Sequence, residues 1–466
     1  DIQKSSGRNF KVYSTYFGSR YSLLAQYSYN KLNTQENGGL NDLVDLIDPP
    51  GSNDKSLVVN LYNANSSNRF SQFYLKQEIN LIGRYKTPDS LVFDLREFPL
   101  ALGNEIIFDN ANRTYTEELE SNYYAFYKIK PFDTTNTNDS AKFRRLSNMV
   151  YLKITGNRRQ GIGVMAGFGV ESEKYMFADY DRYNTNGYFN NSFIHAKIWS
   201  KAYSKFGFDA QTRLYTAGRK SKNFNTSFTI HLNLKVLNHP SVIEGNVFSE
   251  NKSPSSFMEL YSGNIYNWET NLDNQLTNTA SIGLRSLKNR YQIQLSSCMI
   301  NKYTYFDNTL YPNQLSKVSN VSSITLSKTT KIGIIELNNN ILWQKSSTDV
   351  ISLPMFATFN TLSLNYGLFK KKLKVRMGVD VYYWSKFYVP AYSPELGVFY
   401  KQDEMKYGDY PYVDAFTQFN FKRMQLFLKY SHADYELLKK PQFISVHKYP
   451  IQKANFSFGI SWYFYN

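Results

Sequence analysis

A two-residue alternation of apolar and polar side chains is the feature that most constrains how this chain folds. Over residues 372–384 every second position carries Leu, Val, Met or Tyr, and the positions between them include Lys374, Arg376 and Asp380. Successive side chains of a strand point to opposite faces, so this pattern predicts a strand with one apolar and one polar face. At about 3.3 Å per residue the segment is long enough to cross a bilayer core when tilted.

The same alternation recurs along the chain, with boundaries uncertain by a few residues. We expect about 19 strands, over residues 9–18, 21–30, 69–82, 99–112, 143–156, 161–170, 191–204, 206–217, 224–237, 256–268, 277–288, 290–304, 318–329, 332–345, 355–369, 372–385, 411–423, 424–436 and 454–466.

Composition restricts how such strands can be used. Aromatic residues make up 17% of the chain, and no run of about 18 apolar residues is present to form a membrane-spanning helix. Every backbone polar group must be paired inside lipid, so a closed β-barrel is the alternative way to span a membrane. The single cysteine, Cys298, excludes an intrachain disulfide framework.

The joins between these strands alternate in length. Short joins occur near residues 19–20, 157–160, 289 and 370–371, and long polar joins include 31–68, 113–142, 386–410 and 437–453. Tight turns at one end and long loops at the other are typical of outer-membrane barrels, with the turns in the periplasm. Residues 83–98 and 238–255 depart from this rule, because both are long joins at the end where short turns are expected.

Whether the number of strands is odd or even indicates whether further strands precede Asp1. An odd number of strands would make the first and last strands parallel, which bacterial single-chain barrels avoid. The sequence from Asp1 also lacks the charged and apolar regions of a signal peptide. We therefore expect a single barrel domain over residues 1–466 that lacks its signal peptide and one or more N-terminal strands.

Several motifs in a fixed order resemble the family known as putative β-barrel porins of Bacteroidota. The similarity is strongest after residue 300, and no single motif is diagnostic. The matching segments are Glu36-Asn37-Gly38-Gly39, 59–64, Tyr311-Pro312-Asn313-Gln314, Leu353-Pro354, 390–394, 399–402, 408–416 and the closing 458–464. The resemblance implies a barrel in the outer membrane, and the sequence that family members carry ahead of the part matching Asp1 agrees with the parity argument.

Charges on the polar faces of the strands identify candidate pore-lining residues. Rings of Arg and Lys in a water-filled pore favour anions, and the net charge of the chain is +16. The alternative is that nearby acids balance these cations, or that the charge faces acidic lipid headgroups. The candidate pore-lining residues are Lys153, Arg213, Lys235, Arg285, Lys374, Arg376 and Asp380.

Three other features leave structural questions open. Loop 31–68 contains apolar residues and could fold into the lumen, pack on the rim or bind a partner. Glycines alternate with other residues over 161–169, which leaves room for a loop or another chain to approach closely. Asp414 and Asp434 near His432 could form a carboxylate–histidine pair, although a solvated cluster is the simpler expectation.

We expect an integral protein of the cell outer membrane that allows passive diffusion of small hydrophilic solutes, with a preference for anions. The alternative is a non-transport barrel subunit of a larger outer-membrane secretion, uptake or assembly complex. Expected partners are outer-membrane lipid and lipopolysaccharide, together with other outer-membrane proteins or lipoproteins, and not nucleic acid. We expect neither enzymatic activity nor a cofactor or metal, because the five histidines lack metal-binding spacing.

The orientation of one strand tests this interpretation directly. Val379 should face lipid and Arg376 should face water inside the barrel.

Overall fold

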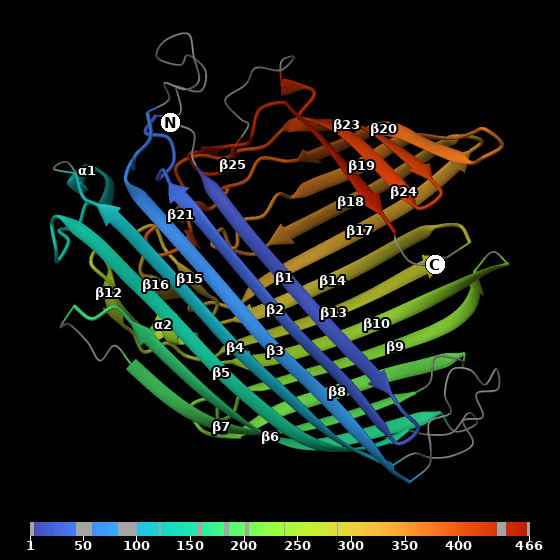
Figure 1. The fold of residues 1–466 in the computed structure, drawn as a ribbon, viewed down its shortest axis with the longest axis horizontal. Coiled ribbons are helices and arrows are strands. Elements are labelled where there is room, and N and C mark those ends of the chain that lie inside the picture. Colours follow the sequence, from blue (N-terminus) through green and yellow to red (C-terminus); the bar gives the residue numbers. More distant parts are fainter. Residues whose placement is uncertain are drawn as a thin grey trace.

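The computed structural model describes residues 4–42, 58–82, 100–120, 123–155, 161–180, 186–200, 205–236, 238–286, 288–435 and 444–463. Nineteen strands form one antiparallel sheet in which strands adjacent in the barrel follow one another along the chain (Figure 1). They are β1 (Ser5–Phe17), β2 (Tyr21–Glu36), β3 (Ala64–Ile82), β4 (Leu100–Glu118), β5 (Asn136–Thr155), β6 (Ile162–Phe177), β7 (Asn186–Ser200), β8 (Phe206–Ala217), β9 (Phe224–Val236), β10 (His239–Lys252), β13 (Gln275–Ser286), β14 (Tyr291–Asn301), β17 (Ser319–Ile332), β18 (Ile335–Ser346), β19 (Phe356–Leu368), β20 (Leu373–Trp384), β23 (Tyr410–Phe421), β24 (Met424–Ser431) and β27 (Asn455–Trp462).

One predicted strand is wrong and one strand was missed. Residues 256–268 do not cross the barrel, whereas residues 239–252, expected to be a long join, form β10 and pair with β9 and β13. The join from β9 to β10 is then short, and the long join follows β10, so the region 238–255 no longer breaks the alternation of turns and loops. The other exception, residues 83–98, lies outside the described residues.

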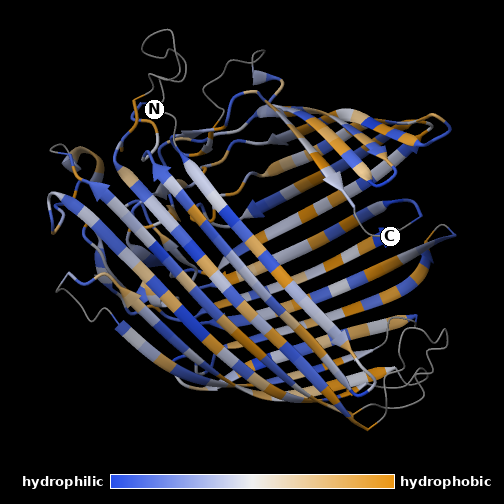
Figure 2. Ribbon diagram, in the orientation of Figure 1, coloured by the Kyte–Doolittle hydropathy of each residue, from blue (hydrophilic) through white to orange (hydrophobic). Residues whose placement is uncertain are grey.

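Strand registers fix which side chains share a face of the sheet. Arg376 lies opposite Asn365 and Gln418, and Val379 lies opposite Leu362 and Ala415 on the other face. We call the Arg376 side the lumen face and the Val379 side the lipid face, because the register around the sheet puts Arg376 on the same face as Tyr115 of β4 and Phe177 of β6, which pack on joins folded inside the barrel. Both residues therefore point as predicted. Figure 2 shows the hydrophobic and hydrophilic residues alternating along the strands.

The two edge strands of the sheet remain apart. Among the described residues, β1 pairs only with β2 and β27 pairs only with β24. Nineteen antiparallel strands make β1 and β27 run in the same direction, as the parity argument anticipates. The existence of further strands ahead of Asp1 stays a prediction.

The long joins fold inward at one end of the barrel and form a hydrophobic core there. It contains Tyr115 and Phe177 from the wall and Tyr261, Trp268 and Leu396 from the joins, all nearly inaccessible to solvent. No helix in the described part of the chain is long and apolar enough to cross a membrane. The short elements of the joins are α1 (Tyr123–Tyr127), α2 (Ser256–Glu259), β11 (Leu260–Ser262), β12 (Asn267–Glu269), β15 (Thr304–Phe306), β16 (Pro312–Gln314), β21 (Ala391–Ser393), β22 (Val398–Tyr400), β25 (Ile444–Val446) and β26 (Tyr449–Pro450).

Alternating glycines of β6 make room for aromatic rings of the neighbouring strands. A Cβ at Gly163 would lie 2.3 Å from Trp199 of β7, and one at Gly169 would lie 2.2 Å from Phe193 of the same strand. The space that the sequence predicts beside these glycines is therefore filled from within the wall, not by a loop or a second chain. Rings lying over glycines on adjacent strands also help to pin the strand register.

Candidate functional site: the lumen of the barrel

All seven predicted pore-lining residues lie on the lumen face. Lys153 is opposite Met165, Arg213 is opposite His195, and Asp380 is opposite Thr361. The remaining four, Lys235, Arg285, Lys374 and Arg376, follow the same alternation in β9, β13 and β20. The register thus puts all seven on one face of the sheet, and their role in lining a pore stays a prediction.

Their charges are only partly available to a solute. Lys153 forms an ion pair with Glu78, which is 7% exposed, and Arg376 Nη2 lies 3.8 Å from Glu336 Oε1. Asp380 accepts a hydrogen bond from the Thr361 hydroxyl at 2.6 Å.

The other cations differ in their surroundings. The Arg213 guanidinium lies 4.5 Å from the centre of the Phe193 ring. Among the described residues, Lys235, Arg285 and Lys374 form no ion pair. These three lie at the end of the barrel with the short turns, whereas Lys11 and Lys252, two further lumen-face cations that form no ion pair among the described residues, lie elsewhere along the lumen.

A dense set of ion pairs lines the wall formed by β3–β8. Arg145 donates from Nε to Asp109 at 2.8 Å. Lys220, in the join after β8, donates to Glu171 at 2.6 Å and to Glu173 at 2.7 Å. These charges hold neighbouring strands and a join together, and such pairing reduces the net field that they present to the lumen.

The opposite wall is nearly free of charge. Lumen-facing positions of β13, β14, β17, β18 and β19 carry mainly Ser, Thr, Asn and Gln, and the charged exceptions there are Arg285, Lys331 and Glu336. Hydroxyl and amide groups both donate and accept hydrogen bonds. This wall therefore offers neutral polar groups to solutes and water.

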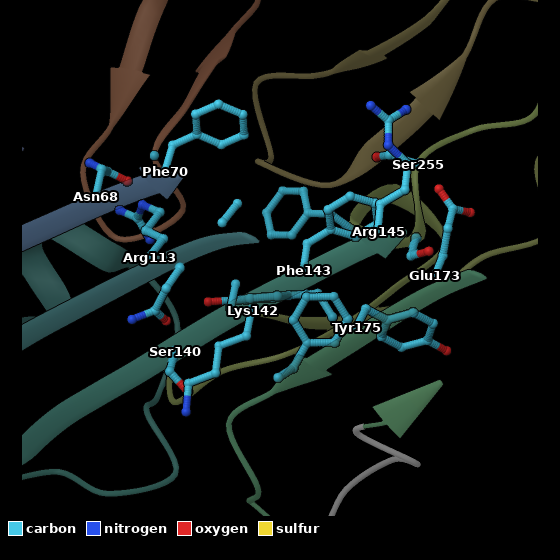
Figure 3. Close-up of a pocket in the computed structure, with 18 of the residues that line it drawn as sticks. Asn68, Phe70, Arg113, Ser140, Lys142, Phe143, Arg145, Glu173, Tyr175 and Ser255 are labelled. Carbon is cyan, nitrogen blue, oxygen red and sulfur yellow. The ribbon is translucent and has the colours of Figure 1, made fainter. Parts of the chain in front are cut away.

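A chamber of about 890 Å³ lies on the lumen side at the end with the long joins. Its volume is within the range of about 300–1,000 Å³ that is typical of small-molecule sites. The chamber is bounded by β2–β6 and by the joins near Phe257 and Leu396. Figure 3 shows Phe70 and Phe143 near its middle, with Glu173 toward one end and Arg113 toward the other.

Arg113 anchors one of the joins to the chamber wall. Its guanidinium donates a hydrogen bond to the carbonyl oxygen of Glu395 at 2.7 Å and another to the carbonyl of Pro394. The Glu395 side chain is 2% exposed, and burial, as the largest cause, raises its pKa to about 7. The charge of Arg113 opposes this rise in pKa, and the charge of Glu117 adds to it.

The sequence did not single out the residues that fill this end of the barrel. Phe257, Tyr261 and Trp268 were read as part of a spanning strand, whereas their rings pack on one another, with 4.8 Å between the centres of the Tyr261 and Trp268 rings. The signal available in the sequence is aromatic clustering without a polar residue at every second position. Loop 31–68 contributes Leu61 to the same core, and its predicted apolar residues Leu43, Val44, Leu46 and Ile47 lie outside the described residues.

The residues around His432 form a structural cluster. The backbone N–H of His432 donates to Asp414 at 3.0 Å, and its Nδ1 lies 2.9 Å from the Gln452 carbonyl oxygen. Asp434 accepts instead from the backbone N–H of Val413 at 2.9 Å. His432 is fully buried and Asp414 is 2% exposed, so the expectation of a solvated cluster is wrong. Burial is possible because backbone donors, together with Lys429 at 2.7 Å from Asp414, compensate the carboxylates.

Comparisons with solved structures show the fold. The siderophore receptor PirA from Acinetobacter baumannii aligns with a TM-score of 0.64 at 10% identity, over 99% of this chain and 71% of the receptor chain. A copper transporter, OprC, gives a TM-score of 0.55 at 9% identity, over 94% of this chain and 75% of its own. BauA, the ferric preacinetobactin receptor from Acinetobacter baumannii, gives a TM-score of 0.54 at 11% identity, over 94% of this chain and 69% of the receptor chain.

At such low identities these similarities concern the architecture of outer-membrane β-barrels and not their ligands. No curated protein matches the chain. The family described as "Putative porin" matches residues 2–466, and it agrees with the polar lumen, the apolar outer face and the up-and-down strand order described above. The chain is therefore an outer-membrane β-barrel that belongs to the "Putative porin" family.

Proposed function

We propose that this protein allows small hydrophilic solutes to diffuse passively across the outer membrane through its lumen. The observation that carries the proposal is the chamber of about 890 Å³ that remains in the lumen beside the infolded joins, with a mainly apolar lining there and with hydroxyl and amide groups on the wall formed by β13–β19. A barrel of this strand number has an interior wider than wall side chains alone can fill. The infolded core narrows the mouth and limits the size of the solutes that pass.

Anion preference is the finer part of the proposal. It rests on Lys235, Arg285 and Lys374, because the other predicted cations either pair with carboxylates or lie over an aromatic ring. Fixed cations at the end with the short turns raise the local concentration of anions in the aqueous lumen.

Swelling of proteoliposomes in solutions of neutral sugars tests the diffusion proposal. Small sugars should enter and swell the vesicles, and the rate should fall steeply as the sugar approaches the width of the narrowed mouth. Proteoliposomes that swell no faster than protein-free vesicles in the smallest sugar would contradict it.

A second candidate function is a subunit of a larger outer-membrane complex. The observation that favours it is the pair of sheet edges, β1 and β27, which lack a further strand partner among the described residues. Exposed strand edges are templates for pairing with another chain. Purification in mild detergent tests this candidate: a protein retained in stoichiometric amount supports it, and a homogeneous single barrel counts against it.

A further inference from the structure

A row of cations crosses the lipid face of β1–β6 at right angles to the strands. Arg8 on β1 lies directly opposite Lys31 on β2, and Lys31 lies directly opposite Arg69 on β3. Asn112 separates Arg69 from Lys142 on β5. Two further cations, Arg144 and Lys174, face each other one step lower on β5 and β6. We call these residues the basic row: Arg8, Lys31, Arg69, Lys142, Arg144 and Lys174.

The strand register shows that the side chains of the basic row do not point into the lumen. The neighbours of Arg69 in β3, Asn68 and Phe70, belong to the lumen face that surrounds the chamber. Figure 3 likewise shows Lys142 and Phe143 leaving β5 on opposite sides. Five of the six cations are exposed, and Lys31 is half-buried.

Nothing within the described protein compensates this charge. None of the six cations forms an ion pair with a described residue. The lipid face of β1–β6 carries one acid, Glu118, which lies six residues beyond Asn112 in β4. Like charges directly opposite each other on adjacent strands destabilise a sheet unless a counterion lies between them.

The position of the basic row relative to the apolar band of the barrel indicates where such a counterion would lie. Below Arg144, the lipid face of β5 carries Leu146, Asn148, Val150, Leu152 and Ile154; the four apolar residues are at least 45% exposed, and Asn148 accepts a hydrogen bond from Asn104 of β4 at 2.6 Å. The eight residue steps from Leu146 to Ile154 span about 26 Å along the strand, which at a tilt of about 40° is about 20 Å of height, within the apolar band of about 25 Å in outer-membrane barrels. Lys142 and Arg144 therefore lie where the apolar band ends, on the side of the long joins, at the level of the outer lipid headgroups, and the row descends from them toward Arg8 because it runs perpendicular to tilted strands.

We propose that the basic row is a binding site for a phosphorylated glycolipid of the outer leaflet. From β1 to β5 it spans about 19 Å at the usual strand spacing, wide enough to contact more than one phosphate group. Arg and Lys bind phosphate through charge-assisted hydrogen bonds. The acyl chains of the same molecule would lie on the exposed apolar side chains of β5 and its neighbours.

Native mass spectrometry of the purified barrel with bisphosphorylated lipid A tests the site. Each cation near a charged headgroup contributes about fivefold in affinity, so the triple variant Lys31→Gln/Arg69→Gln/Lys142→Gln should bind roughly 100-fold more weakly. A matched variant with the same change in charge, Lys235→Gln/Arg285→Gln/Lys374→Gln in the lumen, should bind as the unaltered protein does.

Two further lipids test whether the basic row recognises the phosphate groups of lipid A. Dephosphorylated lipid A should bind weakly to the unaltered barrel, and phosphatidylglycerol should bind less tightly than bisphosphorylated lipid A. Unchanged binding in the Lys31/Arg69/Lys142 variant, or binding of either of the other two lipids that equals that of bisphosphorylated lipid A, would overturn the proposal. Heat-modifiable migration in gels verifies that each variant is folded, and the result is independent of solute diffusion.

Discussion

The ring of Tyr151 on β5 occupies the space that a side chain at Gly103 on β4 would need. The two residues lie directly opposite each other, and a Cβ at Gly103 would lie 2.1 Å from Tyr151 Cζ. The Tyr151 hydroxyl in turn donates to Glu78 at 2.7 Å. A glycine, an aromatic ring and a buried carboxylate on three neighbouring strands therefore form one unit of the lumen wall.

Gly103→Ala should destabilise the barrel by about 1–3 kcal/mol, because the new methyl group overpacks against the Tyr151 ring. Urea unfolding in lipid vesicles measures the change. Gly283→Ala is a matched control, since it is also a lumen-facing strand glycine but its Cβ would meet no atom closer than 3.4 Å. Equal destabilisation by both substitutions would refute the steric explanation.

Lys153→Met should destabilise the same wall by about 1–3 kcal/mol, because it removes the nearer of the two ion-pair partners of Glu78 and leaves only Lys76 at 3.8 Å. The double variant Lys153→Met/Glu78→Gln should recover part of the loss in free energy of unfolding. A double variant that is less stable than Lys153→Met alone would show that the pair does not act as a unit.

The stability of the infolded core should depend on pH through the buried side chain of Glu395. Glu395 has a pKa of about 7, raised by burial above the value of 4.5 expected for an unfolded chain. The folded state therefore binds the proton more tightly, and the stability of the core is greatest below pH 4.5 and falls as pH rises through 7. Hydrogen-exchange protection factors of residues 261–268, which are corrected for the intrinsic pH dependence of amide exchange, should fall over this range in the unaltered protein and change much less in Glu395→Gln. An identical pH response in the variant would assign the effect to another group.

Anion selectivity should depend on Lys235, Arg285 and Lys374, the three predicted pore-lining cations that form no ion pair among the described residues. Neutralising Lys235, Arg285 and Lys374 to Gln should shift the reversal potential in a salt gradient toward cation preference, because fixed positive charge is removed from the aqueous path. Neutralising Lys142, which lies on the lipid face, should leave the reversal potential unchanged. The selectivity proposal is wrong if both variants behave alike.

Periodicity in the sequence predicts the strands well because one face meets lipid and the other meets water. The lipid–water contrast explains why Arg376 and Val379 point as expected. It does not operate in the infolded joins, where Tyr261 and Trp268 pack among other aromatic residues, and so residues 256–268 resembled a strand. β10 escaped notice because Asn246, Phe248 and Glu250 share its lumen face, so apolar and polar positions do not separate cleanly.

The pairing of charges could not be predicted in the same way. Which acid meets which cation depends on the register between strands, and the partner of Lys153 is Glu78, two strands away across β4. Likewise, Arg8, Lys31 and Arg69 are distant in sequence, and only the register places them in one row.

Conductance of the purified barrel in a planar lipid bilayer tests the central claim most directly. The unaltered protein should give stepwise current increases, and Trp268→Ala, which removes a ring from the infolded core, should give larger steps. Trp343→Ala on the lipid face should leave the step size unchanged. A correctly folded barrel that conducts no current, with or without the Trp268 substitution, would contradict passive diffusion through this lumen.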